Sequence, residues 1–187
     1  AGRVETSWTD SLYSSQGDVP PATLSAIQEG IIIKAWRQKV QAPPATVYRE
    51  FTRLGGRRGW LHADWAWRLR GIADHWAGGV GLRSGRRHPE DLRPGDTVDF
   101  WRAEALEPDR MLRLRSEMRS PGEMWLQFEA APQGESSTLL TQTLFFAPKG
   151  LVGLVYWYLL YPLHAFVFSG IVPRLAWAAE TATSDAG

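Results

Sequence analysis

The pattern of hydrophobic and polar positions in residues 97–146 predicts a run of antiparallel β-strands. Apolar and polar residues alternate there along four consecutive segments that are separated by turn residues. Residues 31–41 begin with an isoleucine run and then alternate in the same way, so they predict an earlier strand, which Pro43 and Pro44 stop. The chain therefore predicts one early strand followed, further on, by a four-stranded meander.

Two segments between these strands have helical spacing. Val47, Phe51 and Leu54 recur at intervals of three and four, which predicts a short helix that ends at a Gly-Gly pair. Residues 64–77 predict a second helix. Its apolar stripe consists of Trp65, Leu69, Ile72 and Trp76.

The hairpin between the second and third meander strands allows a register to be predicted. Pairing Arg119 with Glu123 leaves a three-residue loop in which Gly122 supplies a positive φ. This register puts charged residues on one face and apolar residues on the other, and a slip of one residue would destroy both faces. It pairs Glu117 with Trp125, Arg115 with Gln127, Arg113 with Glu129, Met118 with Met124, Ser116 with Leu126, and Leu114 with Phe128.

Polar residues interrupt the inward face of the predicted sheet. Asp99, Ser116 and Gln142 share that face with Trp101 and with several apolar side chains. A buried polar group without a partner costs about 1 to 3 kcal/mol. Three such groups on one face indicate an internal hydrogen-bond network or a wet cavity.

Residues 150–173 contain no Asp, Glu, Lys or Arg. The stretch is long enough to span a bilayer, but Pro162 and His164 interrupt it. We interpret it as a helix buried against the apolar face of the sheet, and apolar nearly all round for that reason. A membrane span is the alternative, and a partly covered helix could contact a membrane surface or another subunit.

The order of these elements resembles the helix-grip fold of the START-like, or SRPBCC, superfamily, which includes polyketide cyclases and lipid-transfer domains. The opening stretch Lys39–Tyr48 is similar to the strand, proline and helix with which that superfamily begins. The resemblance implies a cavity between the sheet and a long C-terminal helix, but no particular reaction.

A bacterial domain family of unknown function, often fused behind an NmrA-like NAD(P)-binding domain, is a closer match. The similarity covers roughly residues 30–180. It implies that an NAD(P)-binding domain could occur in a longer chain or in a partner. The blocks that carry the similarity are Gly78–Arg87, Gly95–Arg102, Glu117–Gly122, Pro148–Leu151, Tyr156–Tyr158 and Pro162–His164.

Composition excludes several classes of function. Lys plus Arg total 21 and Asp plus Glu total 20, so no overall positive field attracts nucleic acid. The chain has no cysteine and its four histidines lack metal-motif spacing, so we expect neither a metal nor a cofactor. No leader segment is recognisable, and we expect a cytoplasmic location.

The predicted architecture is therefore one α+β helix-grip domain, residues 29–182, with a curved antiparallel sheet wrapped around a long C-terminal helix. A loosely ordered arm, residues 1–28, precedes it, and a disordered tail, residues 183–187, follows it. Oligomerisation remains open.

Candidate functional residues fall into three groups. Asp99 and His164 are candidates for acid/base catalysis, with a structural ion pair and a core hydrogen bond as the respective alternatives. Arg83, Arg86 and Arg87 could contact an anion, although a solvated basic loop explains them as well. The predicted ligand-binding residues are Asp99, Trp101, Ser116, Gln142, Tyr156, Tyr158 and His164.

Three functions follow from these features. The first is binding of a small hydrophobic or aromatic ligand in a cavity between sheet and helix. The second is a cyclase- or isomerase-type enzyme that uses Asp99 or His164. The third is a regulatory or interaction domain for a reductase partner or a membrane surface.

Overall fold

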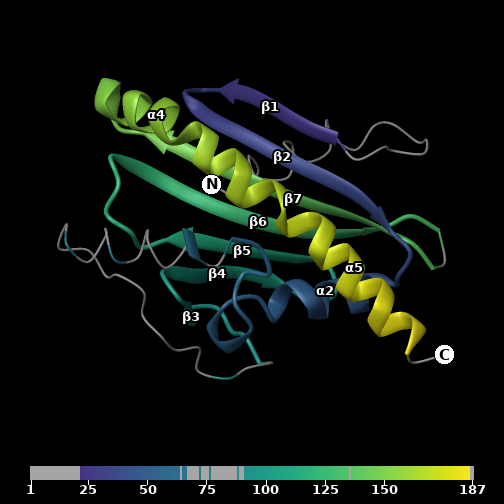
Figure 1. The fold of residues 1–187 in the computed structure, drawn as a ribbon. Coiled ribbons are helices and arrows are strands. Elements are labelled where there is room, and N and C mark those ends of the chain that lie inside the picture. The colour runs from purple at the N-terminus through teal and green to yellow at the C-terminus, as the bar shows by residue number, and fades with distance from the viewer. Residues whose placement is uncertain are drawn as a thin grey trace.

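A computed structural model describes residues 22–63, 91–134 and 136–185, and the isolated positions 65, 66, 72, 76 and 88. These residues form a seven-stranded antiparallel sheet in the order β1-β2-β7-β6-β5-β4-β3. The sheet curves behind two successive helices, α4 and α5, which cross it diagonally (Figure 1). The strands are β1 (Ala22–Gln28), β2 (Ile31–Val40), β3 (Thr97–Val98), β4 (Trp101–Glu107), β5 (Met111–Ser116), β6 (Gly122–Pro132) and β7 (Thr138–Pro148).

The helices follow the predicted order. A short α2 (Pro44–Thr52) comes directly after β2 and leads to a 3₁₀ turn, η1 (Gly56–Arg58). At the C-terminus, α4 (Gly150–Ser169) is separated from α5 (Ile171–Ser184) by Gly170 alone. The helix-grip architecture predicted from the sequence is confirmed.

The first strand of the predicted meander is in fact two strands. Asp99 adopts a positive φ of 56°. Together with Phe100 it forms a turn, across which Val98 of β3 pairs with Trp101 of β4. The region 97–146 therefore contains five strands instead of four. The side chain of Phe100 is buried in this turn.

The predicted hairpin register is wrong by two residues. Arg115 pairs with Trp125 and Leu112 with Phe128, because β5 ends at Ser116 and the connection to β6 is longer than three residues. A shift of two keeps every side chain on its predicted face, since side chains alternate with a period of two. The facial pattern alone could not distinguish the two registers.

Gly122 is required for close packing and not for a positive φ. It pairs with Pro148 at the start of β6. A Cβ atom at this position would lie 2.6 Å from the carbonyl oxygen of Ala147 and 2.6 Å from the Phe146 ring. Any side chain here would push β6 away from β7.

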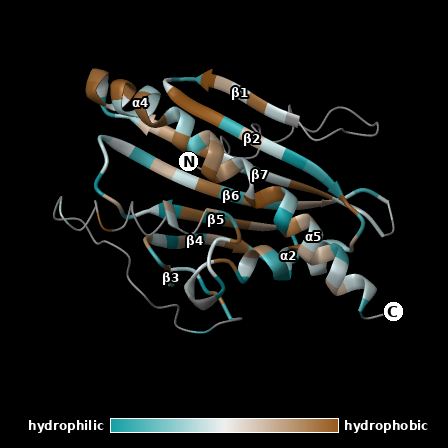
Figure 2. Ribbon diagram, viewed as in Figure 1, coloured by the Kyte–Doolittle hydropathy of each residue, from teal (hydrophilic) through white to brown (hydrophobic). Residues whose placement is uncertain are grey.

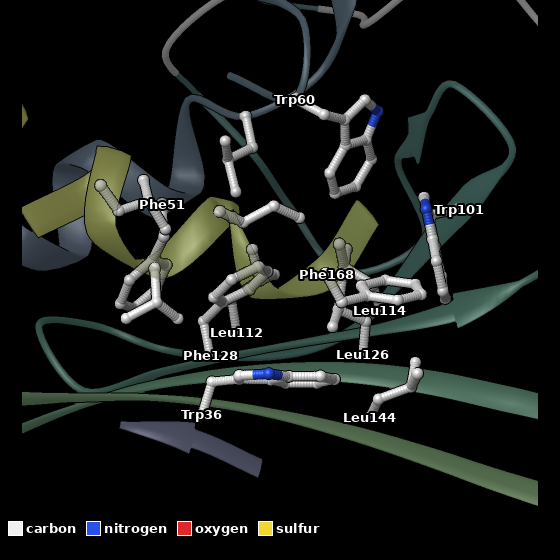
Figure 3. Close-up of a cluster of buried hydrophobic side chains, with 14 of the residues drawn as sticks. Trp36, Phe51, Trp60, Trp101, Leu112, Leu114, Leu126, Phe128, Leu144 and Phe168 are labelled. Carbon is white, nitrogen blue, oxygen red and sulfur yellow. The ribbon is translucent and has the colours of Figure 1, made fainter. Parts of the chain in front are cut away.

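The concave face of the sheet carries the main core. Trp36 of β2 stacks on Phe168 at the end of α4, with ring centroids 6.2 Å apart. Phe51 of α2 stacks on Phe128 of β6 at 5.6 Å. Figure 3 shows these rings converging from the sheet below and the helices above, so α2 and the junction of α4 with α5 cover one common apolar layer.

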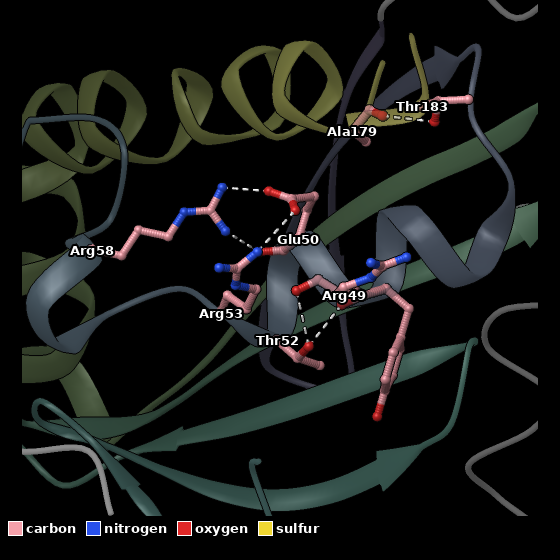
Figure 4. Close-up of polar contacts among 8 residues, drawn as sticks. Arg49, Glu50, Thr52, Arg53, Arg58, Ala179 and Thr183 are labelled. Atoms are coloured by element: carbon pink, nitrogen blue, oxygen red, sulfur yellow. Dashed lines mark hydrogen bonds and ion pairs between the residues drawn. The ribbon is translucent and has the colours of Figure 1, made fainter. Parts of the chain in front are cut away.

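A buried carboxylate holds η1 against α2. Glu50 is 5% exposed, and its carboxylate accepts a hydrogen bond from the Arg58 guanidinium and lies 3.7 Å from that of Arg53 (Figure 4). Arg58 also donates to the main-chain carbonyl of Glu50 at 3.3 Å. These contacts fix the segment that leads from α2 to Trp60.

The C-terminal helix was predicted to be buried against the sheet, but α4 is buried along one stripe only. Only Gly153, Trp157, Val167 and Phe168 of its 20 residues are buried. The segment Gly150–Ser184 is long and apolar enough to cross a bilayer. Only 22% of its apolar 18-residue stretch is buried against the rest of the protein. One stripe of α4 therefore packs on the sheet while the opposite side is both apolar and exposed.

Several predicted boundaries also change. Residues 22–28, predicted as part of a loose arm, form β1 and pair with β2 throughout. The predicted disordered tail overlaps α5, which continues to Ser184. Most of the predicted helix 64–77 lies outside the described residues. Of its stripe, Trp65, Ile72 and Trp76 are exposed.

Candidate functional site

A pocket lies between the sheet and the inner side of α4. The space that water can occupy in it measures about 90 Å³, and one side is open. Most of its wall is apolar or aromatic. The lining residues are Ala66, Phe100, Trp101, Ser116, Met118, Ser120, Met124, Tyr156, Leu160, Leu163, His164, Val167 and Phe168.

The helical spacing of α4 supplies one wall. Leu160, His164 and Phe168 are four residues apart, and Val167 follows His164 by three, so they point in similar directions from the helix. The His164 ring lies 5.2 Å from the Trp157 ring and 6.2 Å from the Phe168 ring, between centroids. His164 lines the pocket together with Leu160, Val167 and Phe168.

The sheet supplies the opposite wall. Trp101 opens β4 and Ser116 ends β5, and the two residues pair directly across the strands. The Ser116 hydroxyl accepts a hydrogen bond from the main-chain N–H of Met118 at 3.3 Å. Both residues line the pocket as predicted, together with Met118 and Met124 beside them.

Trp101 is fully buried among other aromatic rings. Its ring centroid lies 6.1 Å from that of Trp60 and 5.4 Å from that of Phe100. No acceptor among the described residues reaches its indole N–H, and the nitrogen itself has no contact with solvent. The indole nitrogen of Trp101 is therefore not accessible from the pocket.

Asp99 lies away from the pocket wall, in the turn before Trp101. Its carboxylate accepts a hydrogen bond from the indole N–H of Trp60 at 2.9 Å and from the main-chain N–H of Gly56 at 3.3 Å. Burial and these donors make Asp99 a fixed link between the β3–β4 turn and the segment after α2. The carboxylate thus has hydrogen-bond donors in Trp60 and Gly56, while the arginines predicted as ion-pair partners, in residues 83–87, lie outside the described residues.

Gln142 also serves as a link. It is fully buried on β7, and its side-chain amide donates to the carbonyl of Phe168 at 3.0 Å. This bond ties the end of α4 to the middle of the sheet. Gln142 is not among the residues that line the pocket.

The three tyrosines of α4 point in different directions. Tyr156 lines the pocket, with its ring centroid 6.4 Å from that of His164. Tyr158 is 60% exposed on the far side of the helix. The hydroxyl of Tyr161 accepts a hydrogen bond from Lys34 of β2 at 2.6 Å, outside the pocket. Of the predicted pair Tyr156 and Tyr158, the structure brings only Tyr156 to the site.

Two further expectations concern an anion contact and metal binding. Arg83, Arg86 and Arg87 lie outside the described residues. Within the part of the chain that the structure describes, no cluster of three His, Asp or Glu side chains is arranged to hold a metal ion.

Sequence reasoning missed several residues that line the pocket. Leu160, Leu163 and Val167 could have been found from their spacing around His164, because they fall on the same helical face or at its edge. Met118 and Met124 were predicted to face inward, but not to line the ligand site. Methionine side chains adapt to irregular spaces, which makes them suitable for such a wall.

A family model matches most of the chain. The chain belongs to the family described as "Protein of unknown function (DUF2867)", whose model matches residues 31–171. No curated protein matches the chain.

Three solved structures illustrate the structural similarity. Norcoclaurine synthase from Thalictrum flavum has a TM-score of 0.48 and 10% sequence identity, covering 88% of this chain and 97% of its own. The Zhui aromatase/cyclase from Streptomyces sp. R1128 has a TM-score of 0.47 and 15% identity, covering 84% and 98%. A conserved protein of unknown function from Enterococcus faecalis has a TM-score of 0.45 and 13% identity, covering 86% and 78%.

Proposed function

We propose that this chain binds a small, mostly apolar molecule in the pocket between the sheet and α4. The observation that carries the proposal is the space that remains between Trp101, Met124 and His164 inside a region otherwise filled by aromatic rings. Well-packed cores leave few voids larger than a water molecule. An apolar pocket with a few polar groups is the usual form of a small-molecule site.

The size of the pocket limits its ligand. One water molecule needs roughly 10 to 15 Å³ of such space, so the 90 Å³ available corresponds to roughly six to nine water-sized groups. That is enough for one aromatic ring with a short substituent. A larger ligand would extend past Leu163, which lines the pocket and is also partly exposed.

A few polar groups can orient such a ring. The hydroxyls of Ser116, Ser120 and Tyr156 and the imidazole of His164 belong to residues of the wall. Hydroxyl and imidazole groups both donate and accept hydrogen bonds. A phenol, an aromatic ketone or an indole therefore suits the pocket better than a pure hydrocarbon or a charged metabolite.

A ligand-binding measurement with a defined probe tests the proposal. Leu163→Trp places a large ring at the open side of the pocket, while Leu151→Trp makes the same change on the same helix at a residue that does not line it. Indole binding, followed by ligand-detected NMR, should weaken at least tenfold in Leu163→Trp and stay unchanged in Leu151→Trp. Indole that fails to bind the unaltered protein, or binds both variants equally, would contradict the proposal.

A second candidate function is acid/base catalysis on the bound molecule. It is favoured by the position of His164, whose imidazole is the kind of group that transfers protons near neutral pH and which lies in the pocket wall. Once native mass spectrometry has identified a co-purifying ligand, His164→Gln should retain binding while conversion of that ligand stops. Equal conversion by both proteins would exclude His164 as the acid/base group, and no conversion by the unaltered protein would leave ligand binding as the function.

Four expectations about context stay predictions. They are fusion to, or contact with, an NAD(P)-binding domain, an anion contact at Arg83, Arg86 and Arg87, formation of homo-oligomers, and a cytoplasmic location.

A further inference from the structure

Eight of the 14 large hydrophobic side chains that are exposed among the described residues lie on α4. We call this exposed side of α4 the outer stripe. Figure 2 shows α4 coloured predominantly as hydrophobic along its length, in front of the sheet. The outer stripe consists of Leu151, Val152, Val155, Tyr158, Leu159, Tyr161, Leu163 and Phe166, which are between 37% and 76% exposed. Large contiguous apolar patches on a protein surface mark binding surfaces.

The chain segment that carries the outer stripe holds charges of one sign only, and the Glu123 carboxylate of β6 lies 3.9 Å from the ammonium of Lys149 at one end of the stripe. Between Ser136 and Ala179 there is no Asp or Glu, and the only Lys or Arg residues are Lys149 and Arg174. Lys149 precedes the first turn of α4, and Arg174 lies in the first turns of α5. Lys34 adds a third cation beside the stripe, where it donates to Tyr161.

We propose that the outer stripe docks the protein on the surface of a lipid bilayer that contains anionic lipids. Apolar side chains would enter the boundary between headgroups and acyl chains, while Lys34, Lys149 and Arg174 meet the phosphates. Tyr158 and Tyr161 combine an apolar ring with a polar hydroxyl, which suits them to the same boundary. The helix lies on the membrane and does not span it, because Trp157 and Phe168 hold its other side in the core.

A second copy of the chain fits the outer stripe less well than lipid does. The 20 residues of α4 extend about 30 Å. If two copies paired along this length, Lys149 would lie near either the Lys149 or the Arg174 of the other copy. Both arrangements oppose like charges, whereas anionic headgroups complement the cations at both ends.

The outer stripe and the pocket meet at Leu163. This residue lines the pocket and is also 37% exposed on the stripe. A molecule dissolved in the apolar layer of a membrane could therefore enter the pocket without crossing bulk water. This last step rests on the proposed ligand-binding function, but the docking surface itself does not.

Flotation of the full chain with vesicles tests the docking surface. The double variant Val155→Glu, Leu159→Glu puts two negative charges in the middle of the stripe. The matched control is Leu24→Glu on β1. The side chain of Lys34 reaches Tyr161 of α4, so Lys34 lies on the face of the sheet that α4 covers. The next residue, Ala35, points to the other face, because side chains alternate along a strand. Leu24 pairs with Ala35 and therefore also lies on the face away from α4.

The expected result is that the unaltered protein and Leu24→Glu float with vesicles of phosphatidylcholine and phosphatidylglycerol, and bind pure phosphatidylcholine more weakly. The double variant should lose at least tenfold in partitioning while its circular dichroism is unchanged. Three outcomes would overturn the proposal: no flotation of the unaltered protein, equal losses in the control, or a lipid-free dimer that the double variant converts to monomer. Indole binding measured on the same samples reports separately on the pocket.

Discussion

Replacing Asp99 distinguishes a structural carboxylate from a catalytic one. The side chain accepts hydrogen bonds from Trp60 and Gly56, and its main chain adopts a positive φ of 56°. Asp99→Asn keeps an acceptor oxygen and tolerates this φ. Asp99→Gly keeps the backbone conformation but removes the acceptor. Asp99→Ala loses the acceptor and also strains the backbone.

The structure gives an expected size for each effect. Leaving the buried indole N–H of Trp60 without an acceptor costs about 1 to 3 kcal/mol. A left-handed conformation costs a non-glycine residue such as alanine about 1 to 2 kcal/mol more. We therefore expect losses in unfolding free energy of about 2 to 5 kcal/mol for Asp99→Ala and about 1 to 3 kcal/mol for Asp99→Gly. Asp99→Asn should lose less than about 1 kcal/mol, because it keeps both features.

Urea unfolding followed by circular dichroism measures these differences, and indole binding measures the pocket in parallel. The order Ala, Gly, Asn, from the largest loss to the smallest, is the signature of a turn residue that holds Trp60. If Asp99→Ala lost less than about 1 kcal/mol, the structural role would be refuted. An Asp99→Asn variant that folds normally but loses ligand conversion would restore the catalytic hypothesis.

Two further changes test the packing and the electrostatics of the fold. Gly122→Ala should lower the free energy of unfolding measured in urea by about 1 to 3 kcal/mol, because the added methyl group meets the Ala147 carbonyl and the Phe146 ring. An unchanged free energy of unfolding would show that β6 can move without cost. The pKa of Tyr48 is raised above its ordinary value of 10.0 by burial and by the nearby charge of Asp109. The folded protein thus binds the phenol proton more tightly than the unfolded chain does. The stability that this tighter binding contributes is fully present below pH 10, and it is lost as the pH rises through the higher pKa of the folded state. Thermal denaturation from pH 9 upward should show a smaller alkaline loss in Tyr48→Phe than in the unaltered protein, and identical curves would mean that this phenol does not contribute.

The fold could be predicted because its signals are local. Alternation identified β2 and the meander, and helical spacing with a Gly-Gly end identified α2. The turn at Asp99 and Phe100 could not be predicted in this way, because a two-residue turn inside an alternating run leaves little trace in the pattern. The hairpin register failed for a related reason, since its true and predicted forms present the same faces.

The site could be predicted only in part. Trp101, Ser116, Tyr156 and His164 line the pocket, because face and helical spacing determine which way each one points. The places of Asp99 and Gln142 depend on partners that are distant in sequence: Trp60 for the first and the carbonyl of Phe168 for the second. A sequence pattern shows that such a polar side chain is buried, but not which donor or acceptor satisfies it.

Gly170 divides the C-terminal cover of the sheet into two parts with different attachment. In α5, five of 14 residues are buried, whereas α4 has four in 20. His62 bridges the junction, since its ring lies against Phe166 and contacts the Arg174 guanidinium. Because the free energy of local opening follows the buried apolar contacts that must be broken, α4 separates from the strands at lower cost than α5. The pocket therefore lies under the less firmly attached of the two helices.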